Sequence, residues 1–183
     1  AAGLAHAANH GVVHRDIKPG NLLLVDPPEG IPFPADMPMV KIADFGLAIL
    51  TTSEESSTRL TSDNTTVGSP HYMAPEQFQQ SDVDLRADIY SLGASVYHIL
   101  AGKPPFNGSN LTQIMASKMA GRLTPLEELR PGLSPGTYNL LDRMMAQSLD
   151  DRPASYPELI LLIDDLTPTL FEDSSTGGPS ATT

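Results

Sequence analysis

The clearest pattern of apolar and polar positions lies in the middle of the chain. Between residues 85 and 100, large aliphatic side chains recur every three or four positions, which is the spacing of one helix face. This spacing predicts a helix over 82–101, and Gly102 is a natural stop for it. Because this helix is the most apolar in the chain, we expect it to be central and buried. The positions that define the pattern are Leu85, Ile89, Leu92, Val96 and Leu100.

Weaker patterns predict the other regular elements. Residues 1–10 are rich in Ala and favour a helix that Gly11 would end. Two short apolar stretches, 22–25 and 39–42, are typical of a strand pair joined by a Pro-rich surface loop. Further amphipathic helices are expected near 110–120, 136–148 and 155–166.

Two segments lack such patterns. Residues 47–70 are dominated by Ser and Thr, which predicts a mobile loop. Residues 167–183 consist mostly of Ser, Thr, Gly and Pro, and we interpret them as a disordered linker or tail. We therefore expect one domain over 1–166, which is an ordinary length for a single domain.

Composition excludes several classes of function. The chain has 11 Lys and Arg against 22 Asp and Glu, a net charge of −11, which argues against nucleic acid as a partner. It has no Cys, which excludes disulfides, Cys-bound metals and thiol catalysis. No apolar run reaches the roughly 18 residues needed to cross a bilayer, so we expect no membrane contact from this segment. A cytoplasmic location is expected, with any membrane anchor of a longer parent outside this chain.

Three short motifs occur in order along the chain. They are His-Arg-Asp-Ile-Lys-Pro-Gly-Asn at 14–21, Asp-Phe-Gly at 44–46 and Ala-Pro-Glu at 74–76. In this combination the sequence resembles the protein kinase superfamily, specifically its serine/threonine branch and the bacterial members of it. The resemblance covers residues 1 to about 165 and continues through Asp-Ile-Tyr-Ser-Leu-Gly at 88–93 and Asp-Arg-Pro at 151–153.

The resemblance implies a mainly α fold, namely the C-terminal lobe of a kinase domain. This lobe is helical, with a short β-hairpin and an activation segment, here residues 44–76. The Gly-rich loop, strand Lys and helix Glu of the N-terminal lobe are missing, since the chain opens at Ala1 in the helix before the catalytic loop. We therefore expect a fragment that lacks its partner lobe and has little activity alone. The connection from 26 to 38 is long for the family and is interpreted as a surface insertion.

The resemblance also assigns the chemistry. Asp16 would accept the proton of the attacking hydroxyl, and Lys18, two residues later, would lie near the transferred phosphate. Asn21 and Asp44 offer the oxygen ligands that Mg²⁺ prefers, while Leu23 would lie beneath the adenine of ATP. The alternatives are a capping or solvent-facing Asp16 and an Asn21 that serves only as a turn residue.

Two positions indicate the substrate class. In the tyrosine branch of the family, the position that Lys18 occupies here is typically not a lysine. Ser69, between Gly68 and Pro70, stands where the serine/threonine branch has Thr or Ser, whose hydroxyl would bond Asp16 and Lys18. The expected substrates are therefore Ser and Thr hydroxyls of proteins.

Other motif residues are interpreted as structural. Asp88, inside the most apolar helix, would be a costly buried carboxylate unless it is hydrogen-bonded, and in the family it holds the backbone of the catalytic loop. Gly46 would allow the chain to reverse after the Phe45 position. The remaining assignments are two pairs, His14 packed on Phe45 and Glu76 bonded to Arg152.

Arg15, directly before Asp16, suggests regulation. Kinases of the family with this Arg are usually switched by phosphorylation of the activation segment, because the phosphate pairs with the Arg and orders the loop. Thr65, three residues before Gly68, is the first candidate, followed by Thr66 and Thr61. The alternative is a merely polar loop.

Two other functions remain open from the sequence. The chain could belong to a pseudokinase or scaffold that uses this lobe only for protein contacts. A small-molecule kinase of the same fold is the third reading, which the complete activation segment disfavours. Binding of ATP with Mg²⁺ and phosphorylation of a peptide would separate the three.

Overall fold

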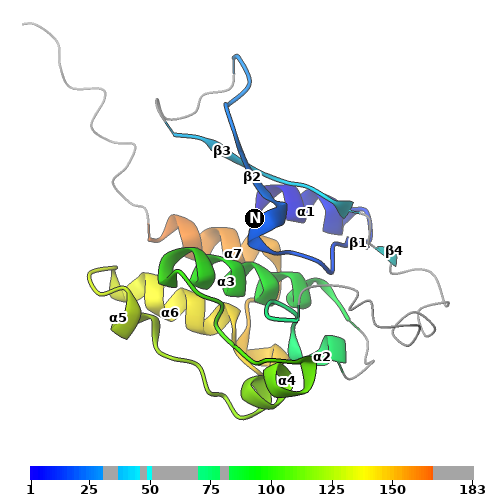
Figure 1. Cartoon of the computed structure of the whole chain (residues 1–183). Coiled ribbons are helices and arrows are strands. Elements are labelled where there is room, and N and C mark those ends of the chain that lie inside the picture. Colours follow the sequence, from blue (N-terminus) through cyan, green and yellow to red (C-terminus); the bar gives the residue numbers. More distant parts are fainter. Residues whose placement is uncertain (31–36, 46–48, 51–69, 79–82, 167–183) are drawn as a thin grey trace, which may run out of the picture.

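The computed structural model describes residues 1–30, 37–45, 49–50, 70–78 and 83–166. Within them the chain is mainly helical, with two small two-stranded sheets (Figure 1). In chain order the elements are α1 (Ala2–Asn9), β1 (Val12–Val13), η1 (Pro19–Asn21), β2 (Leu22–Val25), β3 (Met39–Ile42), β4 (Ile49–Leu50), α2 (Pro75–Phe78), α3 (Leu85–Ala101), α4 (Leu111–Met119), α5 (Leu126–Leu129), α6 (Pro135–Met144), η3 (Leu149–Asp151) and α7 (Tyr156–Asp164), where η marks a 3-10 helix.

The long helix α3 occupies the centre, where it packs against α5, α6 and η1. It begins at Leu85 rather than at 82, because Asp84 caps it: the Asp84 side chain accepts a hydrogen bond of 2.8 Å from the backbone N–H of Arg86. It ends as predicted at Gly102, which adopts a left-handed φ of 72°. The predicted helix is therefore present, shorter by one turn at its start.

The most buried face of α3 is not its large aliphatic stripe. Of the five stripe residues only Ile89 is fully buried, and the other four are half-buried. Gly93, Ala94 and Ser95 are buried instead, and a Cβ on Gly93 would lie 2.8 Å from the Cβ of Met144 in α6. Small residues let the two helix backbones approach, so the periodic pattern predicted the helix but only part of its buried face.

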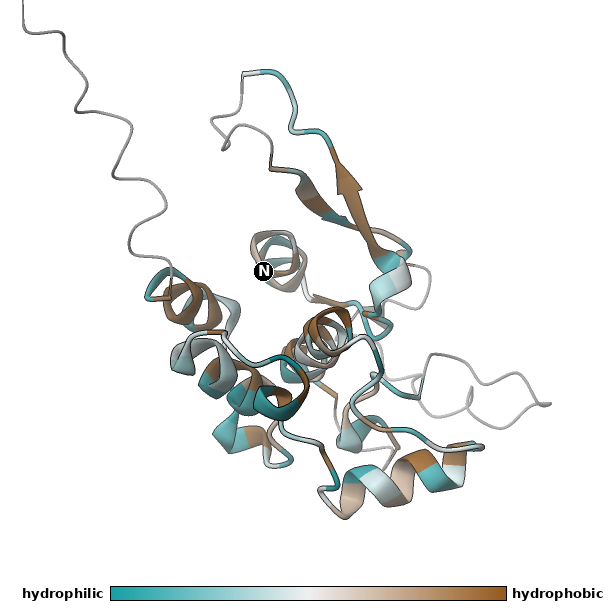
Figure 2. Cartoon of the chain, turned by 60° about the vertical axis from the view of Figure 1, so that its left-hand side comes forward, coloured by the Kyte–Doolittle hydropathy of each residue, from teal (hydrophilic) through white to brown (hydrophobic). Residues whose placement is uncertain are grey.

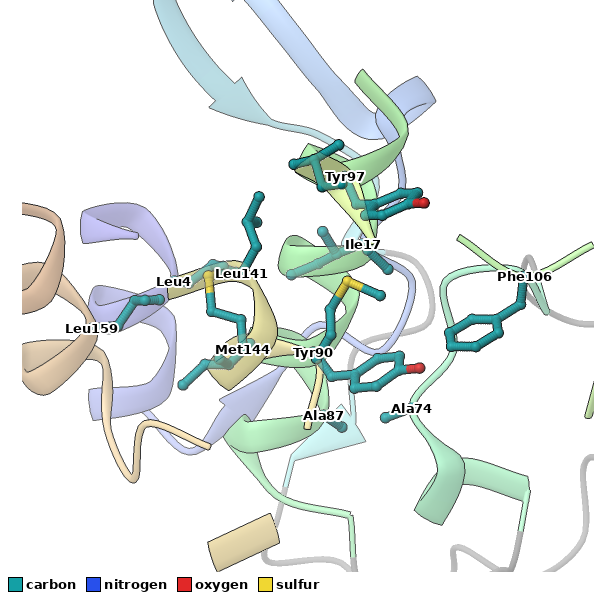
Figure 3. Close-up of a cluster of buried hydrophobic side chains, with 14 of the residues drawn as sticks. Leu4, Ile17, Ala74, Ala87, Tyr90, Tyr97, Phe106, Leu141, Met144 and Leu159 are labelled. Atoms are coloured by element: carbon teal, nitrogen blue, oxygen red, sulfur yellow. The ribbon is translucent and has the colours of Figure 1, made fainter. Parts of the chain in front are cut away.

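One hydrophobic core runs through the helical body (Figure 3). It extends from Leu4 in α1 and Leu159 in α7, past α6 and α3, to Phe106. Residues of irregular segments also belong to it, among them Ile17 at 1% exposure and Ala74 at 0%. The segments that carry the first and third motifs are therefore anchored in the core.

The hairpin β2–β3 stands away from the helices (Figures 1 and 2). Its strands have the predicted bounds and pair antiparallel. Leu24 and Val40 face each other across it, 69% and 55% exposed. The second sheet pairs β1 with β4 and was not predicted, because strands of two residues carry no pattern.

The remaining helices agree with the patterns that predicted them. Asn110, Ser134 and Ser155 cap α4, α6 and α7 with their side chains, and α6 ends at Met144 rather than near 148. The single-turn elements α2, α5, η1 and η3 were not predicted. The connection at 26–38 and the loop at 47–70 lie partly outside the described residues, and the tail at 167–183 lies wholly outside them. Among the described helices, none has the length and apolar character to cross a bilayer.

Candidate active site

Residues 14–21, which the family resemblance marks as the catalytic loop, follow β1, anchor Ile17 in the core and end in η1. The first residues of this loop are held by Asp88 of α3, whose carboxylate accepts hydrogen bonds from the backbone N–H of His14 at 2.7 Å and of Arg15 at 2.8 Å. The Tyr156 hydroxyl donates to the same carboxylate at 3.4 Å. Burial raises the pKa of Asp88, although the two N–H bonds act in the opposite direction. Tyr156 was not singled out from the sequence, since it lies 68 positions from Asp88.

Arg15 adopts a left-handed φ of 66°, which costs energy in a residue other than glycine. Both of its peptide groups are held. The N–H donates to Asp88, and the carbonyl accepts from the Gln77 side-chain amide at 3.2 Å. The surroundings therefore fix this backbone conformation directly before Asp16. Gln77 directly follows the third motif, but its local pattern gave no sign of this contact.

The structure brings Asp16, Lys18 and Asn21 together. The Asp16 carboxylate, 7% exposed as a residue, accepts from the Lys18 ammonium at 2.7 Å and from the Asn21 amide at 3.3 Å. The same amide donates to the Asp16 carbonyl at 2.8 Å. The predicted placement of Asp16 and Lys18 on one side of the loop is therefore observed.

The second motif lies against the same loop. The backbone N–H of Ala43 donates to the Asn21 carbonyl at 2.9 Å, and the Ala43 carbonyl lies 3.1 Å from His14 Nε2. The rings of His14 and Phe45 pack with their centroids 4.5 Å apart. Asp44, between these two contacts, is exposed and has a φ of 63°. The backbone at Asp44 is therefore held next to the catalytic loop on both sides.

The oxygen donors of this site fit a magnesium ion. Asn21 uses its amide nitrogen for the loop, and an amide also carries an acceptor oxygen, while Asp44 supplies an exposed carboxylate. Mg²⁺ prefers such oxygens and takes its other ligands from water and phosphate. Among the described residues there is no group of three or more His, Asp or Glu that could hold a metal ion by itself.

Two further predicted residues lie next to or within these motifs: Leu23 follows the first motif, and Gly46 ends the second. Leu23 lies in β2 opposite Lys41 and is 47% exposed. Gly46 lies outside the described residues, as do Ser69 and the Thr positions 61, 65 and 66. The Arg15 side chain is described, and its buried Nε has no hydrogen-bond partner within the described part of the chain.

The third motif is held by a buried ion pair. Arg152 donates two parallel bonds to the Glu76 carboxylate, at 2.7 and 3.0 Å, and its side chain is fully buried. Its guanidinium also donates to the Ala146 carbonyl at 2.7 Å and lies 4.8 Å from the centre of the Tyr90 ring. This pair joins the end of the activation segment to the C-terminal helices.

Known proteins are similar to this chain over most of its length. Residues 1–160 match the protein kinase domain. The chain is 37% identical to the DNA damage-responsive serine/threonine-protein kinase RqkA of Deinococcus radiodurans, over 83% of this chain and 21% of that protein. It is 34% identical to the serine/threonine-protein kinase PknH of Mycobacterium tuberculosis, over 88% and 24% respectively.

A similar relation holds for the serine/threonine-protein kinase pkn3 of Myxococcus xanthus, with 33% identity over 84% of this chain and 27% of that protein. The chain thus corresponds to between 21% and 27% of the length of these three relatives. The match to the kinase domain covers nearly all of the described residues, the catalytic loop included. The chain belongs to the protein kinase family, among its bacterial serine/threonine members.

Proposed function

We propose that the protein transfers the γ-phosphate of ATP to Ser or Thr hydroxyls of protein substrates. The observation that carries this proposal is the position of Asp16, a buried carboxylate bonded to both Lys18 and Asn21. A carboxylate held this way is suited to accept a proton at a fixed place. Relatives whose names describe serine/threonine-protein kinases support the same chemistry.

The proposed roles follow the contacts. The substrate hydroxyl loses its proton to Asp16 as its oxygen bonds to the γ-phosphorus, while the bond from that phosphorus to the β-phosphate oxygen breaks and ADP leaves. Lys18 stabilises the charge of the phosphoryl group in transfer, because its ammonium lies 2.7 Å from Asp16. Asn21 and Asp44 would hold Mg²⁺, which would neutralise phosphate charge when bound.

We propose further that this chain is the C-terminal lobe of a kinase domain, with residues 167–183 as a linker. ATP would lie over Leu23, whose 47% exposure leaves it accessible to a ligand, and an N-terminal lobe would cover it. The lobe would act in the cytoplasm, with any membrane anchor elsewhere in the longer protein. The chain alone would have little activity, because half of the ATP site is contributed by the other lobe.

Regulation by phosphorylation is part of this proposal. A buried Arg15 Nε without a partner among the described residues supports it, because a phosphate is a strong acceptor for a guanidinium. We expect the phosphate on Thr65, with Thr66 and Thr61 as the next candidates. Phosphopeptide mapping of the active protein tests this, and modification found only at other residues contradicts it.

The central test uses the full-length protein and a protein or peptide substrate. Asp16→Asn keeps the size of the side chain but cannot accept the proton, and we expect phosphorylation to fall at least about 100-fold. Asp26→Asn, at an exposed position of the hairpin connection, is the matched control and should leave the rate unchanged.

The outcome also separates the alternatives. If the unmodified protein transfers no phosphate and ATP with Mg²⁺ does not raise its melting temperature, the proposed activity is wrong and a scaffold is supported. If it phosphorylates small molecules but no peptide, the protein-substrate part of the proposal is wrong.

A further inference from the structure

A lysine with no role in the motifs is buried beside the activation segment. Lys118 of α4 is 2% exposed, one turn after the buried Ile114 on the same helix face. Its ammonium lies 5.3 to 5.7 Å from the ring centres of Tyr90, Phe106 and Phe78. Figure 3 shows Tyr90 and Phe106 of this group beside Ala74.

The three rings come from different parts of the fold, so Lys118 sits in a cage of aromatic faces. Tyr90 lies in α3, Phe78 ends α2, and Phe106 lies between α3 and α4. Such faces attract a cation and offset part of the free energy needed to bury it. A buried ammonium also needs hydrogen-bond acceptors, and the Lys118 ammonium donates to the backbone carbonyl of Met73.

The carbonyl that accepts from Lys118 belongs to the peptide group between Met73 and Ala74. The other half of this group, the N–H of Ala74, donates to the Gln77 side-chain oxygen at 2.8 Å. The Gln77 side-chain nitrogen donates onward to the Arg15 carbonyl at 3.2 Å. The Met73–Ala74 peptide is therefore held on both sides. Its N–H side is linked through the Gln77 side chain to Arg15, the residue with a left-handed φ directly before Asp16.

We propose that Lys118 is a positioning residue that holds the Met73–Ala74 peptide and, through Gln77, aligns the end of the activation segment with the catalytic loop. The contacts of Lys118 and Gln77 are observed whether or not the protein is active, whereas the effect on catalysis rests on the proposed function. This role explains why a lysine is buried on a helix face that would otherwise be apolar.

The charge environment provides a pH test of this role. Burial lowers the pKa of Lys118 to about 7, and Arg152 acts in the same direction, while Glu76 raises it. Raising the pH above 7 therefore removes the cation from the cage. His71 and His98 also lie beside this segment, so a variant must isolate the contribution of the lysine.

The experiment compares Lys118→Met with Lys103→Met in the 183-residue chain by amide hydrogen exchange. Methionine matches the unbranched lysine stem up to Cε, lacks the ammonium and suits an aromatic cage, so Lys118→Met is expected to fold. We expect the Ala74 amide to exchange about tenfold faster, the equivalent of one hydrogen bond. The exposed Lys103→Met variant should match the unmodified chain, and Lys118→Arg should restore protection.

Unchanged Ala74 exchange in a folded Lys118→Met overturns the proposal. If that variant does not fold, the proposal is tested instead by the pH dependence of exchange in the unmodified chain. Its Ala74 protection, corrected for intrinsic exchange, should then fall between pH 7 and 9, and constant protection overturns the proposal.

In the full-length protein, Lys118→Met should lower kcat/KM for the protein substrate about tenfold, with KM for ATP unchanged, because the Asn21 and Asp44 side is untouched. An equal rise in both KM values contradicts a positioning role. If the unmodified full-length protein is inactive, the proposed function fails while the exchange result still decides the role of Lys118.

Discussion

Two irregular segments of this chain are each held by a buried charged side chain from a sequence motif, but the charge is compensated differently. The catalytic loop is held by Asp88, whose carboxylate accepts from two backbone N–H groups and from the Tyr156 hydroxyl. The end of the activation segment is held by Arg152, whose guanidinium is paired with the Glu76 carboxylate. One anchor therefore relies on backbone dipoles and the other on a counter-charge.

The difference decides what happens when an anchor is removed. Loss of Arg152 leaves the carboxylate of Glu76 buried without its main partner, which costs more than loss of both charges together. Loss of the Asp88 charge leaves only neutral N–H groups unsatisfied and at the same time relieves the cost of burying a carboxylate. The ion-paired anchor should therefore be the more sensitive of the two to a single substitution.

The largest effect is expected for Arg152→Ala. It should lower the free energy of unfolding by about 3–5 kcal/mol, the usual cost of breaking a buried pair from one side. Denaturant unfolding of the chain measures this difference, and hydrogen exchange should show the loss concentrated at Glu76 and its neighbours.

The matched control for this prediction is a second Arg–Glu pair. Arg143 and Glu158 are 2.9 Å apart but 44% and 39% exposed. Arg143→Ala should cost only about 0–1 kcal/mol, as surface ion pairs do. Equal losses in the two variants would show that burial does not distinguish the anchors.

A smaller effect is expected for Asp88→Asn. The amide accepts one N–H bond and leaves the other unsatisfied, a cost of about 1–3 kcal/mol that the relieved charge reduces to about 1–2 kcal/mol at neutral pH. Hydrogen exchange at His14 and Arg15 should locate the change in the catalytic loop, since these two N–H groups bond to Asp88.

The same substitution has a defined pH dependence. Burial raises the pKa of Asp88 above its ordinary value of 3.8, so the folded chain binds this proton more tightly than the unfolded chain does. The stability of the unmodified chain relative to Asp88→Asn should therefore fall as pH rises from 3.8 through the raised pKa, and stay constant above it. A difference that instead rises as pH increases towards 3.8 and is constant above it would show that the N–H bonds outweigh burial.

The sequence predicted both anchors, but only through the motif resemblance. The motif resemblance predicted that Asp88 holds the backbone of the catalytic loop and that Glu76 pairs with Arg152. Short motifs allow this because each residue of a motif corresponds to a residue of known role in the family. The periodic pattern predicted α3 and the hairpin strands, but not the close contact of Gly93 with α6, which depends on a helix far along the chain.

Gln77 and Lys118 could not be predicted in the same way. Their acceptors lie 62 and 45 positions away in sequence, and neither belongs to a motif that names a partner. A lysine on the same helix face as Ile114 was the one local sign, since a cation among apolar positions is costly unless it is paired. Contacts of this kind become visible only when the fold places the segments side by side.

The smallest effect is expected where the two segments meet, at Gln77. Its side chain bonds the Ala74 N–H on one segment and the Arg15 carbonyl on the other. Both bonds are partly exposed, so water can replace them, and Gln77→Ala should cost only about 0.5–1 kcal/mol. Gln113→Ala, which removes an exposed glutamine that bonds Ser109, should cost a similar amount.

The distinguishing readout is therefore coupling rather than stability. If Gln77 links the anchors, the free-energy change of Asp88→Asn should differ by about 0.5 kcal/mol or more when it is measured in Gln77→Ala, but not when it is measured in Gln113→Ala. Strict additivity in both backgrounds would mean that the two segments are held independently. In that case Asp88 and Arg152 would each stabilise its own segment, and Gln77 would carry no free energy from one segment to the other.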